Sequence, residues 1–191
     1  FNEENKEAIA NGTCQPRPLS SAAFIEKASG IKSRYVMDKK GILDIDRMKP
    51  CLSTRPNDTL SVQAEMAYHA AMQAIDYAQV NPQAIDMVLV ACSNMQRPYP
   101  AMSIELQQAF GCGGYGFDMN VACSSATFAL QTAYNAIRSG QAKTVVITNP
   151  EICTAHLNFT DRDSHFIFGD AATALVVQSS DIASSSEAYE I

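Results

Sequence analysis

Residues 115–137 read YGFDMNVACSSATFALQTAYNAI. The first five residues follow a glycine-rich link and predict a strand. A helix is expected to open at residues 121–125, because small and apolar residues then recur on one face at helical spacing: Ala126, Ala129, Leu130, Ala133 and Ile137. The helix is expected to end at residues 139–140. The stretch therefore predicts a strand, a sharp turn and a helix, with Cys123 in the first helical turn.

Cys123 is a candidate nucleophile. A helix N-terminus carries unpaired N–H groups and a partial positive charge, and both favour the thiolate form of a cysteine. Its neighbours are small, so that an extended substrate could approach the sulfur, and a backbone N–H at such a turn could stabilise an oxyanion. A strand-to-helix elbow of this kind serves acyl transfer. Position alone leaves open a second reading, in which Cys123 is a packed small residue.

The flanking segments predict an α/β layer. Short apolar runs at residues 87–92, 144–148 and 172–177 are typical of buried strands. A helix is expected to begin at a cap on Asp58 and to end at Asn81-Pro82, with this inner stripe: Leu60, Ala64, Ala67, Ala71, Ala74, Ile75 and Ala78. A second helix is expected at Ser103–Phe110. Alternation of strands and helices indicates helices packed on the faces of a sheet.

The first 57 residues are less regular. Residues 1–18 are polar and predict a loop or a frayed helix. Ser20 or Ser21 can cap a short helix that stops at Gly30. Residues 31–36 resemble a short strand, and residues 37–57, rich in charge, glycine and proline, predict a long surface excursion. A loop is also expected between the strand at 144–148 and Arg162.

Composition excludes several classes of protein. The net charge of -6 gives no basic footprint for nucleic acid, and no run of about 18 apolar residues spans a membrane. Six scattered cysteines without a CxxC pair favour a reducing, cytoplasmic setting. The polar start lacks Met and is not a signal peptide. We therefore expect a piece of a longer chain that also continues past Ile191.

Other reactive side chains carry weaker signals. His69 lies within the long predicted helix and is expected to be packed or partly exposed. His156 and His165 flank a loop, and either could act as a base for Cys123, although spacing cannot show it. No His/Cys spacing predicts a metal site. Arg34 and Arg162 are by default solvated surface charges.

Four ordered stretches resemble beta-ketoacyl-ACP synthase III and its thiolase-superfamily relatives. Residues 121–126 are similar to the active-site cysteine elbow. Residues 29–34 resemble the segment whose Arg meets the phosphates of coenzyme A, and residues 160–162 resemble the loop whose Arg packs on the adenine. Residues 168–172 resemble a Phe-Gly-Asp-Gly-Ala stretch. The resemblance extends from about Phe24 to Val177.

The resemblance implies a thiolase-like α/β fold, layered αβαβα in the complete enzyme, with residues 1–191 as roughly the first of two similar halves. It implies that Cys123 accepts an acyl group from acyl-CoA or acyl-ACP. The acyl-enzyme would then condense with malonyl-ACP, which loses carbon dioxide, in fatty-acid synthesis. The backbone N–H of Cys123 would form half of the oxyanion hole. No cofactor would be bound permanently, since the coenzyme A thioester is a substrate.

Further roles follow from the same resemblance. Arg34 would meet the coenzyme A phosphates, and Phe24 would sandwich the adenine against Arg162. Tyr99 would reach across a homodimer and form the floor of the partner's acyl pocket, and Phe168 would line the substrate region. The His and Asn that drive decarboxylation would lie in the C-terminal half, beyond residue 191.

Departures from the family pattern point to a divergent branch. Ser124-Ser125 replaces the common Ala-Gly, and Ala171 replaces a glycine. Residues 37–57 also form a longer excursion than compact members have. We therefore expect a branch that does not prime with acetyl-CoA.

Two other functions are compatible with the sequence. One is a thiolase-fold acyltransferase that forms the acyl-enzyme without condensation. The other is a non-catalytic partner subunit of a heteromeric condensing enzyme, which the presence of Cys123 argues against.

Overall fold

A computed structural model describes residues 2–17, 19–183 and 188–191. The chain forms two compact units. One unit comprises the residues up to Cys51 together with Cys153–Gly169, and the other comprises Leu52–Ile152 and the residues from Asp170 onward. Within the described ranges, no helix is both long and apolar enough to cross a membrane.

The second unit is built on a four-stranded sheet of order β2-β1-β3-β4. Its strands are β1 (Met87–Ala91), β2 (Tyr115–Met119), β3 (Thr144–Ile152) and β4 (Asp170–Gln178). β1 runs parallel to β2 and β3, in the register Ala91↔Met119 and Val90↔Thr148, whereas β3 and β4 are antiparallel. The carboxyl ends of β1, β2 and β3 therefore share one edge of the sheet.

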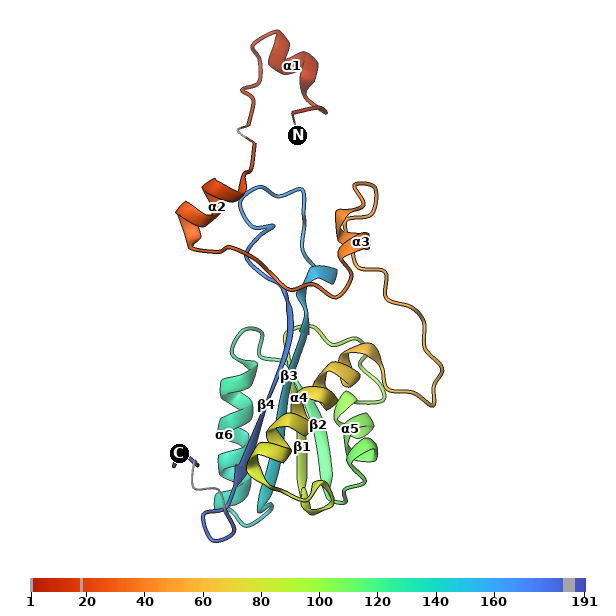
Figure 1. Cartoon of the computed structure of the whole chain (residues 1–191), viewed down its shortest axis with the longest axis vertical. Helices are drawn as coiled ribbons and strands as arrows, with labels where there is room; N and C mark the ends of the chain where they lie inside the picture. Colours follow the sequence, from red (N-terminus) through yellow and green to blue (C-terminus); the bar gives the residue numbers. More distant parts are fainter. Residues whose placement is uncertain (1, 18, 184–187) are drawn as a thin grey trace. The chain divides into compact units, whose positions relative to one another are not determined.

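Helices cover both faces of this sheet (Figure 1). α4 (Val62–Ala78) and α5 (Met102–Phe110) pack on one face, and α6 (Ser125–Arg138) packs on the other. The prediction of an α/β layer with helices on the sheet faces is confirmed.

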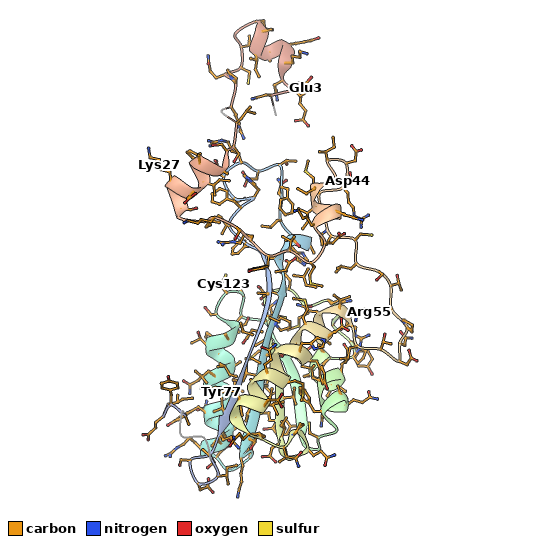
Figure 2. The ribbon with its side chains drawn as sticks, viewed as in Figure 1. Glu3, Lys27, Asp44, Arg55, Tyr77 and Cys123 are labelled. Carbon is orange, nitrogen blue, oxygen red and sulfur yellow. The ribbon has the colours of Figure 1, made fainter. Side chains whose placement is uncertain are left out.

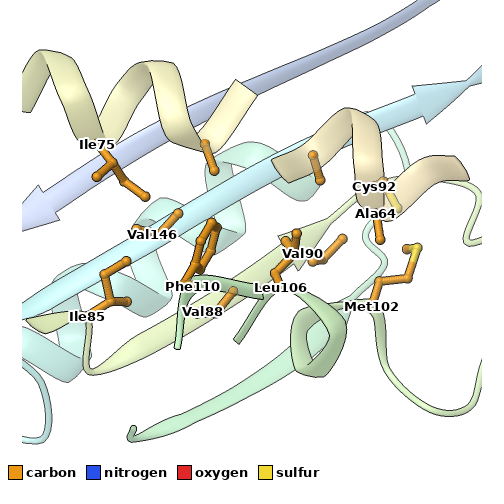
Figure 3. Close-up of a cluster of buried hydrophobic side chains, with 12 residues drawn as sticks. Ala64, Ile75, Ile85, Val88, Val90, Cys92, Met102, Leu106, Phe110 and Val146 are labelled. Atoms are coloured by element: carbon orange, nitrogen blue, oxygen red, sulfur yellow. The ribbon is translucent and has the colours of Figure 1, made fainter. Parts of the chain in front are cut away.

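Each face has its own apolar core. The core under α4 and α5, seen in Figure 3, combines small helix residues with branched strand residues, among them Ala64, Ile75, Val88, Val90, Leu106 and Val146. The core under α6 is Met87, Leu89, Ala91, Ala129, Ala133, Ala136, Ala142, Val145, Ile147 and Val177. Alanines dominate the helix side, which lets the backbone of α6 lie close to the sheet.

Only the central strands are buried along their length. Every residue of β1 is buried, and β3 is buried over most of its length. β2 and β4 are less buried because they are the outer strands of the sheet. β3 also continues to Ile152, so the expected loop after residue 148 begins later, at the short 3-10 turn η2 (Cys153–Ala155).

The cap predicted for the long helix was wrong. Ser61, not Asp58, is the N-cap residue of α4, and its Oγ accepts a hydrogen bond from the Ala64 N–H at 3.4 Å. Asp58 lies in a preceding turn closed by a hydrogen bond from Thr59 N to Pro56 O. The helix ends at Gln79 in a left-handed conformation, before the 3-10 turn η1 (Pro82–Ala84).

The link between α5 and β2 requires glycine. Gly114 has φ +75°, and a Cβ there would collide with the backbone carbonyl of Asp86. A Cβ on Gly116 would lie 2.8 Å from Val88 O. Both glycines let β2 approach β1 closely.

The first unit contains α1 (Lys6–Ala10), α2 (Ala22–Ser29) and α3 (Lys39–Leu43). α2 has the predicted cap: Ser21 Oγ accepts from Phe24 N at 3.1 Å, and Gly30 ends the helix with φ +76°. The strand expected at residues 31–36 was wrong. This segment is irregular, since no described strand lies beside it to satisfy its backbone groups.

Candidate functional site

Cys123 lies on the turn that joins β2 to α6 (Figure 2). The sequence had suggested that Cys123 lies in the first turn of the helix. α6 begins at Ser125, however, so Cys123 precedes the helix. The thiol is free and exposed. The turn stands at the carboxyl edge of the parallel strands, where α/β folds place their functional groups.

The turn is held by its own polar groups. Ala122 has φ +48°, a left-handed conformation that is uncommon for a residue with a Cβ. Ser125 is buried, and its Oγ donates to Ala122 O at 2.7 Å and accepts from Val121 N at 2.9 Å. Asn120 Oδ1 accepts from Ala122 N at 2.9 Å. These contacts fix the backbone on both sides of the position that presents the sulfur.

The backbone N–H of Cys123 belongs to the same turn as the thiol, and Val121 and Cys123 form an isolated backbone bridge there. Ser124 and Ser125 donate their N–H groups to Val121 O and Ala122 O, both at 3.1 Å. An exposed thiol on such a turn can attack a carbonyl carbon while a backbone N–H of the turn stabilises the resulting oxyanion.

Cys92 is the opposite kind of cysteine in the same unit. It is fully buried. Burial, followed by the negative charges of Glu151 and Asp118, raises the pKa of the Cys92 thiol to about 12. Cys92 is therefore protonated at neutral pH and serves as a small core residue.

Tyr99 projects from the loop between β1 and α5. Its side chain is 87% exposed. A role in acyl binding would therefore require a surface from elsewhere to cover this side chain.

Phe24 and Arg162 lie together in the first unit. The Arg162 guanidinium carbon is 4.6 Å from the centroid of the Phe24 ring, which is a cation–π contact. The Phe24 ring, on α2, is 45% exposed. Two flat groups that already face one another can hold a planar base between them if they separate.

The loop that carries Arg162 is shaped by two side chains. Asn158 Oδ1 accepts from Thr160 N and Oγ1 at 3.1 and 2.6 Å. Asp161 accepts from Asp163 N at 3.1 Å and from the Ser164 hydroxyl. The Ser164 hydrogen bond, and then the Asp163 N–H, hold the pKa of the Asp161 carboxyl below its usual value.

Arg34 lies close to the Phe168-Gly169 segment in the same unit. Its Nε donates to Ile167 O at 3.0 Å, and one terminal nitrogen donates to Ser33 O at 3.2 Å. A Cβ on Gly169 would lie 2.7 Å from Tyr35 O, so glycine permits this close passage. A guanidinium has five N–H donors, and the exposed Arg34 therefore keeps donors for an anion such as a phosphate.

Arg34 and Phe168 also line a common pocket of 240 Å³. Its other lining residues include Lys32, Phe159, His165 and Phe166, none of which the sequence had singled out for a pocket. In the sequence these residues appear only as scattered aromatic side chains and one lysine. Such a composition occurs on many protein surfaces and does not by itself predict a pocket. The lining is largely apolar and includes the charged residues Glu26, Lys32 and Arg34.

The three histidines are divided between the two units. His69 is exposed on α4, and His165 Nδ1 lies 3.0 Å from Asp161 O. His156 and His165 belong to the first unit and Cys123 to the second. Among the described residues, no group of three or more His, Cys, Asp or Glu side chains could hold a metal ion.

Two polar residues near Cys123 were missed by sequence reasoning. Ser93 and Glu151 lie at the carboxyl ends of β1 and β3, and Ser93 O accepts a hydrogen bond from Asn120 Nδ2 at 2.8 Å. The sequence did carry a signal for both residues. Ser93 directly follows an apolar run and Glu151 lies near the end of one, and parallel strands bring the side chains at such positions together.

Comparison with known proteins gives a consistent result. The family model for 3-oxoacyl-[acyl-carrier-protein (ACP)] synthase III matches residues 117–189. The chain is 56% identical, over all 191 residues, to the beta-ketodecanoyl-[acyl-carrier-protein] synthase of Pseudomonas aeruginosa and covers 55% of that protein. It is 30% identical over 176 residues to the beta-ketoacyl-[acyl-carrier-protein] synthase III of Ehrlichia canis, covering 92% of this chain and 49% of that protein.

Solved structures agree with the sequence comparisons. The 3-oxoacyl-[acyl-carrier-protein] synthase III of Aquifex aeolicus is 28% identical with a TM-score of 0.68, and the match covers 85% of this chain and 46% of that one. The priming beta-ketosynthase of the R1128 polyketide pathway is 30% identical with a TM-score of 0.67, over 85% and 43% of the two chains. The chain thus spans about half the length of the relatives it matches, and its fold is thiolase-like.

Proposed function

Because the chain is related to 3-oxoacyl-ACP synthase III, we propose that it supplies the nucleophile of a decarboxylative condensing enzyme in fatty-acid synthesis. The observation that carries the proposal is the free, exposed Cys123 thiol on a strand-to-helix elbow. The His and Asn that the family resemblance predicts would come from outside residues 1–191, in a second thiolase-like half.

The reaction proceeds in two steps. The Cys123 thiolate attacks the carbonyl carbon of an acyl thioester, a C–S bond forms, and the carrier leaves as its thiolate. Malonyl-ACP then loses carbon dioxide, and the resulting carbanion attacks the acyl-enzyme carbonyl. A C–C bond forms, and the Cys123 thiolate is released. In each step the Cys123 N–H stabilises the negative charge on the former carbonyl oxygen.

The donor is proposed to be an eight-carbon acyl thioester. The name of the Pseudomonas aeruginosa relative specifies a ten-carbon β-keto product. The malonyl unit contributes two of those carbons, so the acyl-enzyme carries eight. This fits a branch that does not prime with acetyl-CoA.

The coenzyme A of the donor is proposed to bind the first unit. Phe24 and Arg162 would hold the adenine, Arg34 would bind phosphate, and Phe168 would line the approach of the substrate. Tyr99 would close the acyl pocket of a second copy in a homodimer. The six free cysteines fit the reducing environment of the cytoplasm, and no permanently bound cofactor is needed.

The test is intact-protein mass after mixing the complete gene product with acyl-CoA and acyl-ACP donors of two to twelve carbons. We expect a gain of one acyl group, largest with the eight-carbon donor, and no gain for Cys123→Ala. Cys51→Ala, which removes an exposed thiol of the first unit, is the matched control and should still be acylated. Acylation that survives Cys123→Ala would refute the assignment.

A second measurement separates condensation from simple acyl transfer. Release of carbon dioxide from malonyl-ACP should require both the acyl donor and Cys123. Acylation without malonyl-dependent release of carbon dioxide would indicate that the protein is an acyltransferase and not a condensing enzyme. Full activity of a Cys123→Ala assembly would indicate a non-catalytic subunit.

A further inference from the structure

Three polar residues cross the carboxyl edge of the parallel strands. Asn120 follows β2, Ser93 follows β1 by two residues, and Glu151 is the penultimate residue of β3. β1 lies between β2 and β3 in the sheet, so the three residues stand next to one another. We call them the edge row. All three belong to the unit that carries Cys123.

Hydrogen bonds connect the edge row from end to end. Glu151 Oε1 accepts from both the N–H and the hydroxyl of Ser93, each at 2.5 Å. Ser93 O accepts from Asn120 Nδ2 at 2.8 Å. Asn120 Oδ1 accepts from Ala122 N at 2.9 Å. The row therefore links the third strand of the sheet to the residue that precedes Cys123.

The end of the row is one of three described non-glycine positions with positive φ. Ala122 has φ +48°, which the Cβ of an L-residue disfavours. The bond from Ala122 N to Asn120 fixes this conformation, and the conformation sets the directions of the Cys123 thiol and N–H. A shift of Asn120 would let the turn relax and would move both groups.

The Glu151 carboxylate destabilises this end of the sheet through one of its two oxygens. Its Oε2 is buried and has no hydrogen-bond partner among the described residues. A buried polar atom without a partner destabilises a fold. An apolar residue would avoid that cost, so the side chain is explained by the acceptor that its other oxygen supplies to Ser93.

We propose that Glu151, Ser93 and Asn120 are positioning residues that act through Ala122 to align the Cys123 thiol and N–H. The proposal deepens the proposed function, because it rests on Cys123 as the nucleophile. The edge row touches neither the thiol nor the N–H and works only through the backbone of the turn.

The structure supplies variants that cut single links. Asn120→Asp keeps the acceptor for Ala122 N but loses the donor to Ser93 O, because an ionised carboxylate only accepts. Glu151→Ala removes the far end of the row. Asn149→Asp is the matched control: Asn149 Nδ2 donates to Ala91 O at 2.7 Å at the same edge, but this bond does not lead to the turn.

The first readout needs no acyl donor. Native protein is treated with iodoacetamide, and peptide mass spectrometry gives the alkylation rate of Cys123 divided by that of exposed Cys51. We expect Asn120→Asp and Glu151→Ala each to lower this ratio by about fivefold, the factor that corresponds to one net hydrogen bond. Asn149→Asp should leave the ratio unchanged, even if its melting temperature falls.

The second readout separates positioning from binding. In single-turnover acylation of the complete protein, the maximal rate should fall in both row variants while the half-saturating donor concentration stays the same. The double variant Asn120→Asp/Glu151→Ala should be no slower than either single variant, because both cut one chain of contacts. Glu151→Gln, which folds with an acceptor still facing Ser93, should recover most of the rate.

An unchanged ratio in Glu151→Ala, or a double-variant loss equal to the product of the two single losses, would overturn the proposal. Failure of the unmodified protein to accept any acyl group is a separate result. It would remove the proposed function, while the alkylation ratios would still decide whether the edge row controls Cys123.

Discussion

Replacement of Phe24 by alanine should weaken binding of coenzyme A by about 1.5- to 13-fold. A base stacked on an aromatic ring contributes about 1–3 kcal/mol. The base must first displace Arg162 from the ring, and an exposed cation–π contact is worth about 0.5–1 kcal/mol. The ring is 45% exposed, which favours the lower half of these ranges. Subtracting the second range from the first leaves a net loss of about 0.25–1.5 kcal/mol, which converts to the stated factor.

The assay is isothermal titration of unmodified protein and Phe24→Ala with coenzyme A and, separately, with pantetheine, which lacks the nucleotide. Binding of pantetheine should not change. The sequence contains no tryptophan. Phe24→Trp therefore places a single tryptophan in the stack, and its emission should respond to coenzyme A but not to pantetheine.

Phe128→Ala is the control for this experiment. Phe128 lies on α6 in the other unit and is 51% exposed, close to the exposure of Phe24. The Phe128→Ala protein should bind coenzyme A with the same affinity as the unmodified protein. Equal affinity of Phe24→Ala and unmodified protein, or an equal loss for pantetheine, would refute the adenine assignment.

Three further predictions concern the second unit. Gly114→Ala should lower the free energy of unfolding by about 2–4 kcal/mol in urea titration, because a left-handed residue with a Cβ is strained and the Cβ meets the Asp86 carbonyl. The Arg55 hydrogen bond at 2.8 Å lowers the pKa of Glu65 from 4.5, so this pair stabilises the fold above pH 4.5 and its contribution is lost as pH falls through the lowered pKa. Arg55→Met should therefore lower the free energy of unfolding by about 0.5 kcal/mol at neutral pH, because the pair is largely exposed. This difference should shrink at low pH in urea titrations. Cys92, with its pKa raised to about 12, should resist iodoacetamide at pH 8 in native protein and react only in urea, as peptide mass spectrometry would show.

The strands and helices of the second unit were predictable because their signals are local. The apolar run at 87–92 is β1 with its flank, and the expected strand 115–119 has the observed bounds. Helix starts were less certain, because a cap depends on which of several polar residues the turn allows. Ser61 follows the turn that Asp58 occupies, and only the folded geometry distinguishes them.

The candidate nucleophile was identifiable from the sequence, whereas the residues that hold its turn were not. Cys123 stands out because its neighbours in sequence are small and a strand and helix flank it. Glu151 meets Ser93 across a gap of 58 residues, and that meeting depends on strand order and register. The segment 31–36 shows the converse: β-branched and aromatic residues suggested a strand, but a strand forms only where a neighbour offers hydrogen bonds.

The Phe24–Arg162 contact has a consequence for the proposed binding of coenzyme A. Arg162 is tethered to the same chain, so it covers one face of the ring at a constant effective concentration, whatever the cellular supply of nucleotide. An adenine would have to separate the two groups before it could enter between them. The closed pair would thus be a competitor built into the chain, and it would lower the apparent affinity for the donor.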